Sequence, residues 1–223
     1  MRNTKRKTFL TIDNAEELTG VHYTLKHSGK MSGMQSLSTS CLCNKNCLSR
    51  VENSNLVCSH CYAQRQMKMY KNLEKCLKKN TEILTTKLLT DEEIPLINAA
   101  FFRFESFGDL NNEVQIVNYF RICKRNKHVK FALWTKNPWI IAEAINNGES
   151  KPRNLQIVYS SPYLNKCDNK LNKYPFIDKI FTVYTKEYIE ANNIEINCGA
   201  KSCLSCHKCY IKSKVVYINE RCK

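Results

Sequence analysis

The chain has 223 residues, 43% of them hydrophobic, which suits one sizeable globular domain or a domain with a small appendage. Its formal net charge of +15 comes from 35 Lys and Arg against 20 Asp and Glu, and a positive field of that size favours polyanionic partners such as nucleic acid. The sequence excludes a membrane span, and its basic start leads into an apolar run too short for a signal peptide, so we expect a cytoplasmic protein.

The first third of the chain places a group of cysteines between a polar leader and a helix. Residues 1–30 are polar and basic, and we predict that they form an N-terminal leader or lid. Residues 31–40 alternate weakly between apolar and polar, which predicts a first strand. Apolar residues at gaps of three, four or seven then predict one long helix from 63 to about 89, with Cys76 as a core residue on its apolar stripe. Between strand and helix lie five cysteines: Cys41, Cys43, Cys47, Cys58 and Cys61.

The middle of the chain alternates apolar runs with helical patterns. We predict strands at 99–105, 129–134, 155–159, 180–184 and 194–196, and helices at 112–126, 139–147 and 186–192. Strands separated by helices imply parallel β-α units with right-handed crossovers. Six strands in all are too few for an eight-unit barrel. The predicted fold class is therefore α/β, a partial (β/α)6 TIM-like barrel over 31–197 with cysteine-rich cluster-binding loops, and an open parallel sheet is the alternative.

Residues 198–223 form a C-terminal cysteine-rich tail, which we predict to bind a metal centre. Cys198, Cys203, Cys206 and Cys209 follow the spacing C-x4-C-x2-C-x2-C. Thiolates at two-residue gaps suit a shared metal centre, and in a reducing compartment clustered cysteines are more often metal ligands than disulfides. Adjacent C-x2-C steps that share a cysteine fit iron–sulfur ligation better than zinc, because zinc sites usually separate their two pairs by a dozen or more residues.

The first cysteine group predicts a second centre, with Cys41, Cys47, Cys58 and Cys61 as its ligands. Five cysteines for at most four ligand positions leave at least one bystander. The alternative is a zinc staple built on Cys58 and Cys61 with two other cysteines.

Four further side chains are candidate catalytic residues, because ligands of parallel α/β folds bind at the carboxyl ends of the strands. Glu105 and Asp109 could bind a cation or transfer a proton, although Asp109 could instead cap the next helix. Lys136 could bind a phosphate or carboxylate, or be a solvated loop lysine. Arg103 lies within an apolar strand, where it needs an anion from a neighbouring strand or a ligand.

Several segments together resemble a family of phage proteins. Residues 57–63 read Val-Cys-Ser-His-Cys-Tyr-Ala, with Tyr70 beyond them, and this segment is similar to a motif of the gene-product-88 family. Residues 102–110, 129–136 and 198–209 resemble later segments of the same family, in the same order. Cys41, Cys58 and Cys61 match best upstream, whereas Cys43 and Cys47 lie outside the matched part. The resemblance implies a phage or mobile-element protein in the cytoplasm of the host cell.

The outline also resembles the radical S-adenosylmethionine enzymes, which combine a six-unit partial barrel with a cluster loop after the first strand and often share the Cys-Tyr-Ala ending. Their C-x3-C-x2-C motif is contiguous, whereas ten residues separate Cys47 from Cys58 here, and no Gly-Gly-Glu stretch follows the second strand. The resemblance implies one or two [4Fe–4S] clusters, S-adenosylmethionine as a cofactor, an electron donor, and a redox or radical reaction on an unknown substrate. The alternative function is a zinc-stapled nucleic-acid-binding protein.

Overall fold

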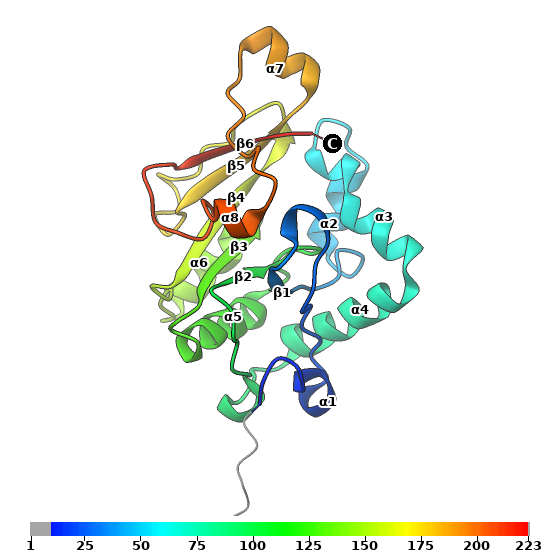
Figure 1. The fold of residues 1–223 in the computed structure, drawn as a ribbon, viewed down its shortest axis with the longest axis vertical. Helices are drawn as coiled ribbons and strands as arrows, with labels where there is room; N and C mark the ends of the chain where they lie inside the picture. Colours follow the sequence, from blue (N-terminus) through cyan, green and yellow to red (C-terminus); the bar gives the residue numbers. More distant parts are fainter. Residues whose placement is uncertain (1–9, 223) are drawn as a thin grey trace, which may run out of the picture.

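The computed structural model describes residues 10–222, so the first nine residues of the predicted leader lie outside it. It contains one sheet of six strands, all parallel, in the order β1-β2-β3-β4-β5-β6 (Figure 1). This confirms the α/β prediction. Each strand pairs with its successor along the chain, which is the order of a partial barrel, whereas a doubly wound sheet reverses its strand order at a switch point. The strands are β1 Gln35–Leu37, β2 Phe101–Phe104, β3 Lys130–Thr135, β4 Leu155–Leu164, β5 Lys179–Tyr184 and β6 Tyr217–Arg221.

The helices alternate with these strands. They are α1 Ala15–Thr19, α2 Lys45–Val51, α3 Tyr62–Met69, α4 Lys71–Thr86, α5 Glu113–Arg125, α6 Pro138–Asn146, α7 Lys186–Asn192 and α8 Cys203–Cys206, with 3-10 turns at Gly29–Met31, Val57–His60 and Asp91–Glu93. The side chain of Asn112 caps α5, because it accepts a hydrogen bond from Gln115 N at 3.1 Å. Among the described residues no helix is long and apolar enough to cross a membrane.

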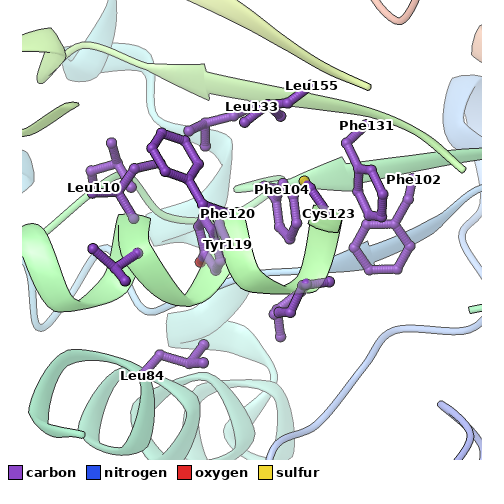
Figure 2. Packing of buried hydrophobic residues seen from close by; sticks show 14 of the residues in the cluster. Leu84, Phe102, Phe104, Leu110, Tyr119, Phe120, Cys123, Phe131, Leu133 and Leu155 are labelled. Atoms are coloured by element: carbon purple, nitrogen blue, oxygen red, sulfur yellow. The ribbon is translucent and has the colours of Figure 1, made fainter. Parts of the chain in front are cut away.

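The main hydrophobic core lies between one face of the sheet and helices α4, α5 and α6. Figure 2 shows Phe102 and Phe104 of β2 with Phe131 of β3 facing Tyr119 of α5. The ring of Phe104 stacks on Tyr119 at 4.2 Å and on Phe131 at 5.3 Å. Because side chains alternate along a strand, the intervening residues Phe101, Arg103 and Trp134 point to the other face. That second face carries the cysteine-rich tail.

Two predicted elements differ from the structure. The long helix is broken at Tyr70, whose backbone is extended, into α3 and α4; the apolar spacing runs through the break and so does not reveal it. The strand predicted at 194–196 is wrong, since these residues are not in the sheet. The sixth strand is instead β6, which follows the tail and pairs with β5, where Ile218 is 1% exposed. The chain at Cys198 only lies beside β6, where its N–H donates to Asn219 O.

Candidate metal centre

Both cysteine groups line one cavity of about 670 Å³ at the carboxyl ends of the strands. All twelve residues predicted as ligands or catalytic groups contribute to its wall: Cys41, Cys47, Cys58, Cys61, Cys198, Cys203, Cys206, Cys209, Arg103, Glu105, Asp109 and Lys136. The eight cysteines are free thiols. Segments more than 130 residues apart in the chain therefore meet at one site.

The loop after β1 and the following helices position the first cysteine group. The side chain of Asn44 accepts hydrogen bonds from the N–H groups of Asn46 and Cys47 and so caps α2. Asn44 also donates to the carbonyl groups of Asp109 and Leu110 at 3.0 Å, which fixes this loop to the loop after β2. Four of the five cysteines of this segment line the cavity. Cys43 is exposed and does not line the cavity, which makes it the bystander in this geometry.

Cys61 is the most acidic thiol of this group. A hydrogen bond from Cys41 lowers its pKa to about 6, and the N–H groups of Ala63 and Gln64 at the start of α3 and the charge of Lys136 act in the same direction. The shared proton raises the pKa of Cys41, which is 2% exposed. A thiolate is the form that binds metal, so at neutral pH Cys61 is in the protonation state that a metal ligand requires.

The tail is anchored to the second face of the sheet by aromatic contacts. The ring of His207 stacks on Phe101 of β2 at 5.3 Å, and buried Tyr210 packs edge-on against Phe101 and Trp134. His207 has a left-handed φ of 40° and ends α8, so the chain turns back sharply between Cys206 and Cys209. Burial raises the pKa of Cys209 to about 12. Without a metal this thiol therefore keeps its proton.

A lysine from the N-terminal segment closes the tail side of the cavity. Lys30 Nζ donates to the carbonyl oxygen of Cys198 at 2.8 Å, to its sulfur at 3.2 Å and to the carboxylate of Glu220 at 2.7 Å. Burial alone would lower the pKa of Lys30, but the hydrogen bonds to Glu220 and Cys198 raise it. The lysine therefore stays charged beside a predicted ligand.

Arg103 has no carboxylate partner in the part of the chain that the structure describes, so the predicted pairing with a neighbouring strand is wrong. Its guanidinium stacks on Trp134 at 4.1 Å, and its Nε is buried without a hydrogen-bond partner. A stacked guanidinium tolerates burial because it is weakly hydrated. Burial acts to lower the pKa of Arg103, and the thiols of Cys203 and Cys209 are among the groups that raise it. The arginine is therefore available to an anion within the cavity.

Glu105 is part of the cavity wall but is only 2% exposed. Its carboxylate accepts hydrogen bonds from Thr39, Gln115 and the hydroxyl of Tyr119. Its backbone has a left-handed φ of 57°, which turns the chain at the end of β2, and a Cβ on Gly108 would lie 2.5 Å from its Oε2. Burial raises the pKa of Glu105 to about 7, although these hydrogen bonds act in the opposite direction. The residue joins β1, β2 and α5 below the site.

The raised pKa of Glu105 predicts a pH-dependent stability. The folded chain holds this proton more tightly than the unfolded chain, so the contribution is complete below pH about 4.5 and is lost as pH rises through about 7. Glu105→Gln should remove this pH-dependent loss of stability, because the glutamine side chain does not ionise. We expect the variant to gain on the order of 3 kcal/mol over the wild type between pH 5 and pH 8 in urea unfolding. Wild-type and variant curves that stay parallel over this range would contradict the expectation.

Asp109 does not cap α5, so that alternative is wrong. Its carboxylate accepts hydrogen bonds from Thr135 Oγ1 at 2.6 Å and from Lys136 N at 3.0 Å, and Arg50 lies 3.9 Å away. These contacts tie the loop after β2 to the end of β3. The side chain of Lys136 is half-buried and has no carboxylate within 4.0 Å among residues 10–222. The positive charge of its ammonium acts to lower the pKa of the Cys47, Cys58 and Cys61 thiols.

Sequence reasoning missed three residues of the site. Lys30 contacts Cys198, Arg50 of α2 donates to Asn137 at 2.7 Å, and the Tyr62 hydroxyl donates to the carbonyl oxygen of Ser106. Tyr62 lies in the Cys-Tyr-Ala segment and could have been found there. Lys30 and Arg50 carry no local signal, because their partners lie at least 59 residues away.

No curated protein and no solved structure matches the chain. The model of a protein family described as Gene product 88 matches residues 2–221, which is nearly the whole chain. The chain therefore belongs to the gene-product-88 family.

Proposed function

We propose that this protein binds iron–sulfur clusters, one in each cysteine group, and uses them for electron transfer to a substrate in the shared cavity. The observation that carries the proposal is the arrangement of the eight predicted ligand cysteines, four from each cysteine group, around one cavity of about 670 Å³, whose wall also includes Cys222. Four cysteines suffice for one [4Fe–4S] cluster. The cavity wall thus supplies ligands for two.

The spacing of the sulfurs supports iron over zinc. In a tetrahedral zinc site with Zn–S bonds of about 2.3 Å, cysteine sulfurs lie about 3.8 Å apart. A cluster holds its cysteines farther apart, because iron and sulfide ions lie between them. In the described part of the chain, no three cysteine sulfurs lie within 4.8 Å of one another. Among the described residues, neither cysteine group therefore has the compact arrangement of a tetrahedral zinc site.

The charges of the cavity wall also suit clusters. A cluster ligated by thiolates is an anion, and burying it requires nearby cations or donors. The positive charges of Arg50 and Lys136 favour the thiolate form of cysteines in the first group. Those of Lys30 and Arg103 do the same in the second group. Arg103 and Lys136 have no carboxylate partner among the described residues, so we assign to them the binding of an anionic part of the substrate. Asp109 orients the backbone of Lys136.

Whether S-adenosylmethionine can bind depends on how many cysteines hold the first cluster. Its binding needs an iron without a cysteine ligand, and Cys41, Cys58 and Cys61 alone would provide such a cluster. Cys47→Ser separates the two forms. If three cysteines hold the first cluster, the variant keeps its full iron content, and adding S-adenosylmethionine to the reduced protein shifts its electron paramagnetic resonance spectrum. An unmoved spectrum argues against this cofactor.

The test of the proposed function is the metal content after anaerobic reconstitution. The protein should hold about eight irons and eight sulfides per chain, with the brown colour of clusters. Stoichiometric zinc without iron in protein purified anaerobically would overturn the proposal.

A second candidate function, nucleic-acid binding, is favoured by one basic surface. Tyr70, which is 58% exposed, lies in the chain between α3 and α4, and these two helices carry six exposed cations: Arg65, Lys68, Lys71, Lys75, Lys78 and Lys79. Lys71 and Lys78 share the carboxylate of Glu74, while the others have no such partner among the described residues. An exposed aromatic ring between cations suits single-stranded nucleic acid.

Salt dependence tests this candidate. The affinity for a labelled single-stranded oligonucleotide should fall by about tenfold or more between 50 and 200 mM salt, because several phosphate contacts release counterions on binding. Fluorescence anisotropy measures this affinity. Lys68→Glu on α3 should weaken binding, whereas the same change at exposed Lys186 on α7 should not. Binding that ignores salt, or no binding, removes the candidate.

A further inference from the structure

Three metal-binding side chains meet outside the cavity, where α1 packs on α4. Glu16 of α1, His22 in the following loop and Cys76 of α4 place a carboxylate oxygen, a ring nitrogen and a sulfur all within 4.8 Å of one another. Across the described residues, no other trio of His, Cys, Asp or Glu donors is so close. We propose that Glu16, His22 and Cys76 bind one divalent ion of the zinc class.

The core fixes two of these donors relative to each other. Asn80 is fully buried on α4, one turn after Cys76. Its side chain accepts a hydrogen bond from His22 N at 2.7 Å and donates to His22 O at 2.8 Å. The backbone of His22 is thus clamped to α4, one turn from the thiol. Neither hydrogen bond involves the ring of His22, which is left to its partners in the trio.

A glycine permits the close approach of α1 to α4. Gly20 ends α1 with a φ of 79°, and a Cβ there would lie 3.0 Å from side-chain atoms of both Lys79 and Ile83. The N–H of Gly20 donates to the carbonyl oxygen of Glu16 at 2.9 Å. A residue with a side chain at this position would be strained by the positive φ and would have to displace the ends of the Lys79 and Ile83 side chains. Glycine therefore lets the end of α1 lie against α4 without these costs.

The donor set selects the ion. Sulfur, imidazole nitrogen and carboxylate oxygen are all ligands of Zn²⁺, and three protein ligands with one water complete its tetrahedron. Ligands at bond lengths of about 2.0–2.3 Å lie about 3.3–3.8 Å apart. His22 Nδ1 and Glu16 Oε2 are 2.6 Å apart, in direct contact, and would separate by about 1 Å to admit the ion. The side chain of Glu16 is 50% exposed, so an ion can enter from solvent.

The proposed ion would tie the N-terminal segment to α4. This segment runs on from His22 to Lys30, which contacts Cys198 of the tail. The simpler interpretation of the same contact is an ion pair between Glu16 and His22 that does not involve Cys76. The two interpretations differ in whether the thiol takes part.

Cobalt binding to the full chain separates them. After iron and sulfide loading, one equivalent of Co²⁺ is added as a probe for the zinc class, and absorption from the cobalt–thiolate bond is recorded. We compare the wild type, Cys76→Ser, His22→Gln and the control Cys167→Ser, whose thiol is exposed and outside both cysteine groups. Wild type and control should bind about one ion more per chain than the other two, and only they should gain thermal stability with Zn²⁺.

Equal cobalt–thiolate absorption in wild type and Cys76→Ser would overturn the assignment. The outcome is independent of the cluster proposal, because the readout is the difference between two variants that share the eight cavity cysteines. The iron content of Cys76→Ser should equal that of the wild type. If reconstitution fails in every variant, the cluster proposal falls and the cobalt difference still decides this site.

Discussion

Cys61→Ala should lose the iron of the first cysteine group, about four of about eight irons per chain, and keep the rest. The reason is that Cys61 is a thiolate at neutral pH. Its pKa is lowered by a hydrogen bond from Cys41, by two N–H groups at the start of α3 and by the charge of Lys136. Alanine removes the sulfur and leaves Cys41 without its partner. Iron and sulfide determination after anaerobic reconstitution measures the effect.

Two further variants make this result specific. Cys206→Ala should lose a comparable amount of iron from the tail, and Cys43→Ala, an exposed cysteine off the cavity wall, should lose none. Circular dichroism establishes that each variant is folded. Equal iron in Cys61→Ala and Cys43→Ala would show that the first group does not hold a cluster.

Phe104→Ala should destabilise the fold by about 3–5 kcal/mol, the usual cost of removing a buried aromatic side chain. Phe104 is fully buried in β2 and its ring stacks on both Tyr119 and Phe131, so the truncation leaves a cavity between the sheet and α5 (Figure 2). Denaturant unfolding at constant pH measures the loss. Because the residue faces away from the cysteines, iron bound per folded chain should not change.

A matched truncation on the surface sets the baseline. Leu18 of α1 is 62% exposed, and Leu18→Ala should change the free energy of unfolding by about 0.5 kcal/mol or less. A loss in Phe104→Ala no larger than this would contradict the assignment of β2 to the centre of the core.

Periodicity predicted most of the fold because its core elements are locally consistent. Strands β2, β3, β4 and β5 are apolar runs, and the helices that follow β2 and β3 already imply that neighbouring strands pair in parallel. The sixth strand escaped prediction because Tyr217–Arg221 is short, half-polar and preceded by the cysteines, so only its pairing with β5 identifies it. The break at Tyr70 escaped because the apolar spacing continues across it.

The cysteine candidates could be named from spacing alone, and the rule that sites lie at strand ends placed both groups on one side. The partners of the charged candidates could not be predicted. That Arg103 stacks on Trp134, and that Asp109 binds Thr135 instead of capping α5, depends on which strands are neighbours. Cys76 was expected in the core, yet it is half-buried at the junction with α1. Such contacts join distant segments and leave no periodic trace.

The measurement that tests the central claim most directly is electron paramagnetic resonance of the fully reduced, reconstituted protein. Two clusters on the wall of one cavity are close enough for their spins to interact. We therefore expect a broadened, coupled spectrum in the wild type that becomes a simple signal of one cluster in both Cys61→Ala and Cys206→Ala. Uncoupled signals, a single cluster in the wild type, or a diamagnetic protein with zinc in place of iron would contradict the account.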